Sequence, residues 1–197
     1  MKKIVSIVLV VVVVIVIAGF GGKKLMDKIF PQANGMIVYG EKQQVKDVLD
    51  KQAKQLKASD VYTIKISEAG VQKVMYVSQA TIDGLIQKKL LMKVKEDGST
   101  EAVVSLPPVS KGEGLLFAKK ESDKINGNSG TLAVKYEGNL IIGDGRAYAD
   151  EFVVLENAHW SSLQETEKTM AVLKFNKNPE KLMGTFEVET QQLVNIK

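Results

Sequence analysis

The sequence contains no cysteine. A disulfide framework and a thiolate metal site are therefore both excluded. No cysteine follows the apolar N-terminal run either, so we expect no lipid-modified cysteine there. A disulfide-free domain depends on its own hydrophobic core, and the 167 residues from Pro31 onward are enough to build one.

Arginine and histidine are nearly absent, with one of each in the chain, Arg146 and His159. Nucleic-acid and phosphate binding draw on arginine forks and clustered basic residues, so we predict no nucleic-acid partner. One histidine cannot build a histidine metal site. The only tryptophan, Trp160, follows this histidine directly.

Sequence motifs for catalysis are also lacking. There is no Gly-x-Ser-x-Gly elbow and no phosphate loop ending in Gly-Lys-Ser/Thr. Ser122 and Lys124 lie in a charge-dense stretch typical of a solvated surface, and Glu156 beside His159 makes no recognisable triad. We therefore predict no catalytic residue and no enzyme activity, and a hydrolase built on either pair is the least favoured alternative.

Two groups of oxygen-bearing side chains are candidate calcium ligands. The first is Asp123 with Asn126 and Asn128, and the second is Asp144 with Asp150 and Glu151. Neither has the alternating ligand positions and terminal glutamate of an EF-hand loop. Turns and strand ends account for the same residues, so we predict no metal and no cofactor.

The chain opens with an uncharged apolar run from Ile4 to Phe20, preceded by Lys2 and Lys3 and followed by Lys23 and Lys24. As a helix, these residues would extend roughly 25 Å, close to the thickness of the hydrocarbon core of a bilayer. The run predicts a single-pass membrane helix, and residues spaced along it that would face lipid are Ile4, Val8, Val12, Ile15 and Phe20.

An uncleaved signal-anchor is favoured over a cleaved signal peptide. The triplet ending at Ala18 could be a cleavage site, but the apolar run continues beyond it and then meets lysines. The lysines on the two flanks nearly balance, so the short N-terminal tail decides the expected orientation. We expect the body to lie outside the cytoplasm, held at the cell membrane, or to be secreted if cleavage occurs near Ala18.

The net charge of +4 belongs to the flanks of the apolar run. Beyond residue 24 the chain has 23 basic and 23 acidic residues, so the body is formally neutral. The basic character of the sequence therefore does not describe a basic binding face.

Hydrophobic periodicity predicts one amphipathic helix, Glu41 to Ala58, with apolar residues at three- and four-residue steps. The helix would lie on a sheet or form a stalk next to the membrane, and the first arrangement is favoured because single helices usually pack on sheets. Residues 25–30 would extend the membrane helix to Pro31. Residues 79–89 could be a helical turn or a loop.

The rest of the chain shows the two-residue period of β-strands. Strands at 61–67 and 71–78 would form one hairpin, and Asp97-Gly98 predicts a second between 90–95 and 102–106. A short strand at 115–118 and a polar loop over 119–130 come next. From Thr131 we expect a β-meander, with a return strand at 140–142, a buried strand at 152–155, Trp160 on a strand or loop, and a last hairpin joining 170–175 to 184–190.

We therefore predict an α+β fold that is mostly antiparallel β. It would comprise a single N-terminal transmembrane helix, one juxtamembrane amphipathic helix and a β-meander or sandwich-like domain. Residues 1–30 would be the membrane anchor and 31–197 the extracytoplasmic domain, with a possible internal boundary near 107–114.

The predicted function is a non-catalytic structural or interaction module of an envelope, secretion or surface assembly. Its partners would be the bilayer, through residues 4–20, and other proteins or further copies of itself. The alternative is a carrier of a lipid or other apolar ligand, and Trp160 is the candidate ligand-binding residue. An apolar cavity behind Trp160 would favour the carrier, and a solid core would favour the assembly module.

Overall fold

The computed structural model describes residues 33–68 and 72–197. These residues belong to one unit, Ala33–Lys197. The apolar run of residues 4–20 and the extension over 25–30 lie outside the described residues. In the part that is described, no helix has the length and apolar character needed to span a membrane.

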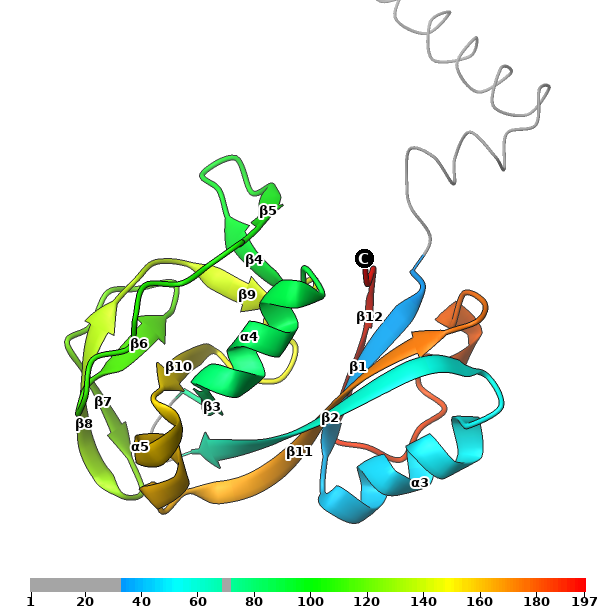
Figure 1. Cartoon of the computed structure of the whole chain (residues 1–197), viewed down its shortest axis with the longest axis horizontal. Helices are drawn as coiled ribbons and strands as arrows, with labels where there is room; N and C mark the ends of the chain where they lie inside the picture. The colour runs from blue at the N-terminus through cyan, green and yellow to red at the C-terminus, as the bar shows by residue number, and fades with distance from the viewer. Residues whose placement is uncertain (1–32, 69–71) are drawn as a thin grey trace, which may run out of the picture. The chain divides into compact units, whose positions relative to one another are not determined.

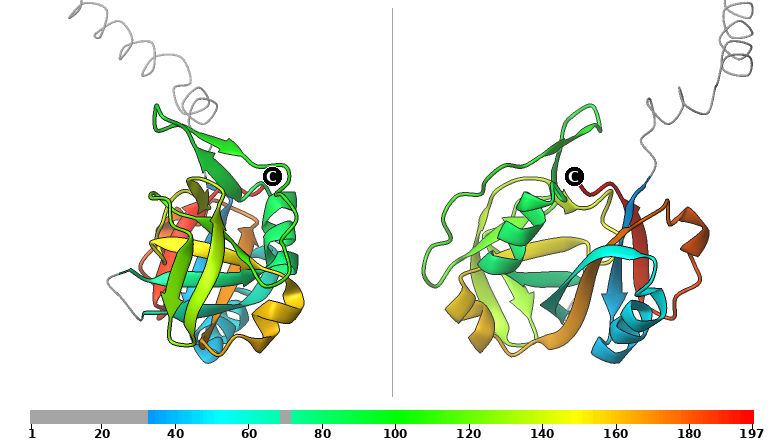
Figure 2. Two further views of the ribbon diagram at one scale, coloured as in Figure 1. Left: turned by 90° about the vertical axis from the view of Figure 1, so that its left-hand side faces the viewer. Right: turned by 45° about the vertical axis from the view of Figure 1, so that its right-hand side comes forward.

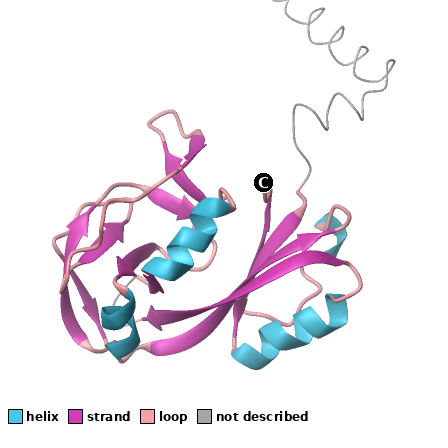
Figure 3. Cartoon of the chain, in the orientation of Figure 1, coloured by secondary structure: helices cyan, strands magenta, loops and turns pink. Residues whose placement is uncertain are grey.

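Strands outnumber helices in this unit (Figure 3). The helices are α3 (Lys42–Gln52), α4 (Gln79–Gln87), α5 (Asn157–Ser162) and the short 3-10 helix η1 (Glu180–Leu182). The strands are β1 (Gly35–Gly40), β2 (Leu56–Ser67), β3 (Val74–Ser78), β4 (Leu91–Val94), β5 (Thr100–Ala102), β6 (Gly114–Phe117), β7 (Lys124–Gly127), β8 (Gly130–Tyr136), β9 (Leu140–Ile142), β10 (Glu151–Leu155), β11 (Thr166–Phe175) and β12 (Thr190–Val194). The prediction of a mostly antiparallel, β-rich fold with few helices is confirmed.

Nine strands form one sheet in the order β12-β1-β11-β2-β3-β10-β6-β8-β7, and β5-β4-β9 form a second sheet (Figure 1). The pairings are antiparallel except β10 with β3 and β6 with β8, which are parallel. The chain on both sides of residues 107–114 contributes strands to the nine-stranded sheet.

The central strands are buried on both faces, which explains their continuous apolar sequences. In β10, Phe152 and Val154 enter one hydrophobic cluster, and Val153 and Leu155 enter another on the opposite face. Successive side chains of a strand point to opposite faces, so one strand serves two cores. β1 and β11 do the same, and their second face packs under α3.

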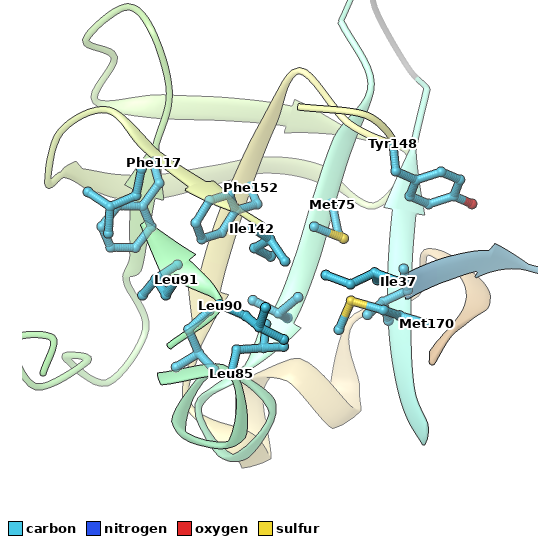
Figure 4. Close-up of a cluster of buried hydrophobic side chains, with 14 of the residues drawn as sticks. Ile37, Met75, Leu85, Leu90, Leu91, Phe117, Ile142, Tyr148, Phe152 and Met170 are labelled. Atoms are coloured by element: carbon cyan, nitrogen blue, oxygen red, sulfur yellow. The ribbon is translucent and has the colours of Figure 1, made fainter. Parts of the chain in front are cut away.

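The largest core fills the space enclosed by the nine-stranded sheet, α4 and the small sheet. Figure 4 shows side chains from distant segments meeting here, among them Leu85, Leu90, Met75, Phe152 and Met170. Each is no more than 4% exposed. α4 is fixed at its start by Ser78, whose side chain accepts a hydrogen bond from the backbone N–H of Thr81.

α3 covers the opposite face of β1 and β11 through Val45 and Val48. The arrangement favoured from the sequence, a helix lying on a sheet, is therefore observed. A reciprocal capping box between Glu41 and Gln44 begins the helix. The predicted end at Ala58 is wrong, because residues from Leu56 onward belong to β2, which pairs with β11 between Leu56 and Ile66.

The far end of the nine-stranded sheet curls back on itself. The turn between β7 and β8 reaches the end of β2 and the residue before β11. The backbone N–H of Asn128 donates to the Ser67 Oγ, and that of Ser129 donates to the Glu165 Oε1. We call the curled strands β3, β10, β6, β8 and β7 the small barrel (Figure 2). A cluster that includes Val74, Tyr76 and Ile125 packs inside it.

Several local predictions hold, including the β2–β3 hairpin and the β4–β5 hairpin around Asp97-Gly98. The strand predicted at 102–106 ends at Ala102, and the predicted loop 119–130 contains β7. The ambiguous segment 79–89 is helical over α4.

The predicted meander after Thr131 is wrong. β9 leaves its neighbour β8 and pairs with β4 in the second sheet, while β8 pairs with β6 and β7. The predicted last hairpin is also wrong, because the final strand is Thr190–Val194 and pairs with β1. Trp160 lies in the helix α5 and not on a strand or loop. For the meander and the last hairpin, the polar turn residues were identified, but tertiary packing selected the strand partners.

Candidate functional site

An open hollow of about 760 Å³ lies at the mouth of the small barrel. It sits where β3 and β10 begin, and the segment after β6 and the strand β7 form its other walls. Its lining residues are Gln72, Val74, Ala118, Lys119, Lys120, Glu121, Ser122, Lys124, Ile125, Asn126, Arg146, Asp150 and Glu151. We call it the barrel-mouth hollow. Mouths of β-barrels are frequent ligand sites, and this volume is within the range such sites have.

The floor of the barrel-mouth hollow is apolar. Val74, Ala118 and Ile125 line the hollow and also belong to the cluster inside the barrel. Each is at most 5% exposed. A ligand entering the hollow would therefore meet the upper layer of the barrel core, where its apolar groups could be removed from water.

Arg146, the only arginine of the chain, is fixed in the wall. One guanidinium nitrogen donates to the Asp150 carbonyl at 2.7 Å and another donates to the Asn139 Oδ1 at 2.5 Å. Its Nε is buried with no hydrogen-bond partner among the described residues. Burial lowers the pKa of the guanidinium, while the charges of Glu151 and Asp150 raise it. Arginine nevertheless stays protonated at neutral pH, so the wall carries a fixed positive charge.

Glu151 brings a buried carboxyl group to the same hollow and is 9% exposed. Burial raises its pKa above the usual glutamate range, the charge of Asp150 raises it further, and Arg146 opposes both. Tyr76 projects into the barrel between two acids, and burial followed by the charges of Glu165 and Glu151 raises its pKa. The hollow thus combines an apolar floor, a carboxyl group whose burial is unfavourable when it is charged, and an arginine fixed by hydrogen bonds.

The rim of the hollow carries three exposed lysines, Lys119, Lys120 and Lys124. Glu121 and Asp150 are the exposed acids of its lining. Positive groups around an apolar floor suit a partner segment that carries both apolar and acidic residues.

Trp160 closes the other end of the small barrel. Its indole Nε1 donates to the Tyr76 carbonyl at 3.1 Å, and its ring packs on the barrel cluster. The buried Lys65 lies 4.6 Å from the ring centroid and donates to the carbonyls of Trp160 and Leu163 at 3.0 and 2.7 Å. Trp160 therefore packs the base of the barrel, and the barrel-mouth hollow is lined by other residues.

The residue pairs considered for hydrolysis have ordinary structural roles. The Ser122 hydroxyl donates to the Lys124 carbonyl at 2.6 Å, which closes a local turn. His159 and Glu156 lie in and just before α5, and the backbone carbonyls of both accept helix hydrogen bonds. Nucleophilic catalysis requires an activating base within hydrogen-bond reach of the nucleophile, and the hydrogen-bond partner of the Ser122 hydroxyl is a backbone carbonyl.

The oxygen groups considered for calcium are spread over different elements. Asn126 accepts a hydrogen bond from Thr131 across β7 and β8, and the Asn128 N–H donates to Ser67. Asp144 lies in the β9–β10 loop, where its N–H donates to Gln192, away from Asp150 beside Lys73. Across residues 33–68 and 72–197, no group of three or more acidic or histidine side chains could hold a metal ion.

Residues 33–197 match the model of an uncharacterised lipoprotein family. The chain belongs to that family. The match spans the whole unit described above. The crystal structure of a candidate lipoprotein from Bacillus anthracis is similar, with 28% identity and a TM-score of 0.74, and the match covers 84% of this chain and 100% of that one. No curated protein matches the chain.

The barrel-mouth hollow was not predicted from the sequence. In the sequence, Arg146 indicates only that nucleic-acid binding is unfavoured, and Glu151 belongs to a nonspecific acidic group. The one available signal was the single arginine. In a chain with 27 basic residues, one arginine among lysines indicates a position where the planar guanidinium group is needed.

Proposed function

We propose that this protein is a membrane-tethered, non-catalytic interaction module that works outside the cytoplasm and binds a partner segment in the barrel-mouth hollow. The observation that carries the proposal is the hollow itself, in which an apolar floor, a held arginine and a lysine rim converge at the end of a small barrel. A tightly packed main core supports a binding function. The structural roles of Ser122, Glu156 and His159 also support it.

Membrane attachment is supported by the family and by the apolar run. Proteins named as lipoproteins are held at membranes by acyl chains, and this chain has no cysteine to carry one. We propose that residues 4–20 take the place of the acyl chain as a single-pass anchor, with Ala33–Lys197 outside the cytoplasm. A helix of that length can cross the hydrocarbon core.

The lipid-carrier alternative needs an internal apolar cavity. A hollow at the edge of the main core, lined by Tyr39, Met75 and Phe152 among others, measures about 20 Å³. Ligand cavities usually enclose roughly 300 Å³ or more. The tight core therefore favours the interaction module over a carrier.

Site-specific photo-crosslinking in intact membranes tests the proposal. A photoreactive residue at Ser122, on the rim of the hollow, should give a discrete protein adduct, and one at Gln43, on the exposed side of α3, should not. Reversing the charges of Lys119 and Lys120 should reduce the adduct. Intact mass analysis of the purified chain should show Met1 at the N-terminus.

The outcomes separate the alternatives. An adduct twice the mass of the chain identifies self-association, and a different constant mass identifies another protein. A lipid adduct from Ser122 would favour the carrier. Equal yields from Ser122 and Gln43, or no adduct from either, would count against a partner site in the hollow.

A further inference from the structure

A second surface of the unit has the composition of a membrane contact. It lies where β11 ends and the loop to β12 begins, over an open hollow of about 430 Å³ beside the end of α3. The buried Phe175 and Pro179 and the half-buried Leu182 form its apolar floor, and the exposed Lys54, Lys177 and Lys181 supply its charge. We call these six residues the β11-end surface.

The charge of this surface is one-sided. None of the side chains that line the hollow is acidic. Within the described residues, Lys54, Lys177 and Lys181 form no ion pair, whereas seven ion pairs occur elsewhere in the unit. The acid next to Lys181 in sequence is the exposed Glu180, whose carboxylate accepts a 3.5 Å hydrogen bond from the Asn178 side chain and offsets part of the lysine charge. Because the body as a whole is formally neutral, this local excess of positive charge is a property of the site.

An exposed apolar side chain accompanies the lysines. Met183 directly follows η1 and is 40% exposed, one of three large hydrophobic residues in the described chain with that much exposure. Basic side chains around an apolar tip suit the boundary between headgroups and acyl chains, where the ammonium groups meet anionic lipid and the apolar group enters the bilayer.

The position of the chain entry agrees with this assignment. The backbone N–H of Phe175 donates to the Asn34 carbonyl at 2.9 Å, so the β11-end surface adjoins the point where the described chain begins. Twelve residues, 21–32, lie between Phe20, the end of the apolar run, and Ala33, the first described residue. A segment of twelve residues reaches at most about 40 Å, so an anchor at residues 4–20 would tether the unit through the point where the described chain begins.

We infer that the β11-end surface rests on the anionic headgroups of the membrane to which the protein is tethered, with Met183 entering the interface. The inference rests on the proposed membrane attachment and adds the face that the unit turns toward the lipid. The barrel-mouth hollow, formed by other elements, then stays available to a partner. Each lysine near an anionic surface contributes favourably, and the contribution falls off within a Debye length.

The absence of cysteine makes the test direct, because a single introduced thiol labels one position. The full chain carrying Met183→Cys, labelled with an environment-sensitive fluorophore, is reconstituted into phosphatidylcholine vesicles with or without phosphatidylglycerol and with a lipid-borne quencher. We expect quenching at position 183 in the anionic vesicles and its loss in high salt. A label at Gln43→Cys should stay unquenched.

Two matched triple variants complete the design. Replacing Lys54, Lys177 and Lys181 by Glu should abolish quenching at position 183. Replacing Lys119, Lys120 and Lys124 by Glu, the same change of charge at the barrel mouth, should leave it unchanged. Equal effects of the two variants, or equal quenching without anionic lipid, would overturn the inference.

Flotation of the vesicles separates this inference from the proposed function. A chain that floats with the vesicles but shows no quenching at position 183 contradicts the docking surface alone. A chain that does not float contradicts both the membrane attachment and the docking. Crosslinking from Ser122 remains an independent measure of the partner site.

Discussion

Glu189 connects two of the polar groups at the open end of the main core. Its carboxylate accepts hydrogen bonds from the Tyr148 hydroxyl at 2.6 Å and from Lys168 at 2.5 Å. Lys168 also pairs with Glu41 at the start of α3, and Tyr148 stacks on Tyr39 with ring centroids 4.5 Å apart. Burial raises the pKa of Glu189, but the bonds from Lys168 and Tyr148 outweigh it and the pKa is lowered.

We expect Glu189→Gln to reduce the free energy of unfolding at pH 7 by about 1 kcal/mol, since charge-assisted hydrogen bonds become neutral ones in a partly exposed site. The folded pKa lies below the unfolded value of about 4.3, so this stabilisation is present above that value and is lost as the pH falls through the folded pKa. Urea unfolding of both proteins from pH 7 to pH 2.5 measures the difference.

The control for this prediction is Glu187→Gln, which removes an exposed charge two residues away on the same loop. It should change stability little at any pH. A difference between Glu189→Gln and wild type that persists unchanged at the acid end would contradict the assignment to the ionised pair.

At the scale of elements, α5 depends on its neighbours. It has six residues, too few for an isolated helix to persist in water. Lys65 of β2 is 4% exposed and donates to three carbonyls at the end of this helix, those of Trp160, Ser161 and Leu163. A cation at a helix C-terminus also interacts favourably with the helix dipole.

We expect Lys65→Met to reduce the free energy of unfolding by about 2 kcal/mol, because three partly buried carbonyls at the end of the helix lose a charged donor. The emission of Trp160, the only tryptophan, should change in the folded state because α5 loosens against the barrel. Lys57→Met, at an exposed position of the same strand, should alter neither quantity. Equal losses in the two variants would indicate an effect of strand composition and not of the helix contact.

The whole unit depends on a sheet that returns to itself. The small barrel closes where the β7–β8 turn meets β2 and β11, elements that are far apart in sequence. Gly127 sits at this closure, and a methyl group there would lie 2.5 Å from the Glu165 Oε1 and 2.8 Å from the Tyr76 Oη. Real side chains do not keep such distances, so a methyl group here would force the ends of the Glu165 and Tyr76 side chains to move.

We expect Gly127→Ala to lower the free energy of unfolding by about 2 kcal/mol. The added methyl group would displace the Glu165 carboxylate and break the hydrogen bond that it accepts from the Ser129 backbone N–H. Gly145→Ala is the matched control, since no heavy atom lies within 4 Å of its added carbon. Thermal unfolding of both variants measures the effect. A Gly127→Ala protein as stable as wild type would show that the closure has room to adjust.

Local sequence signals predicted much of the secondary structure. Asp97-Gly98 predicted its hairpin because the turn needs residues that accept positive φ, and Gly98 has a φ of 80°. The continuous apolar runs predicted buried strands such as β10. The helix α5 was not predicted, because six residues show little helical periodicity. The hydrogen bonds that stabilise its end come from Lys65, on a strand about 95 residues earlier in the chain.

Strand partners could not be predicted in the same way. The turn at 137–139 lies between two real strands, yet β8 and β9 join different sheets because β9 fills the open side of the main core beside β4. The barrel-mouth hollow was out of reach for the same reason. Its arginine, its buried glutamate and its apolar floor come from separate segments that only the curl of the sheet brings together.

The sequence by itself determined the formal neutrality of the body, the lack of thiol chemistry, the β-rich composition and the prediction of an apolar anchor, because each depends on residue type and local period. Tertiary structure alone decided which strands pair, that Trp160 packs the base of a barrel, and where a binding hollow lies. Those features depend on contacts between distant segments, whose free energy comes from burying apolar surface jointly and is not encoded in any single stretch.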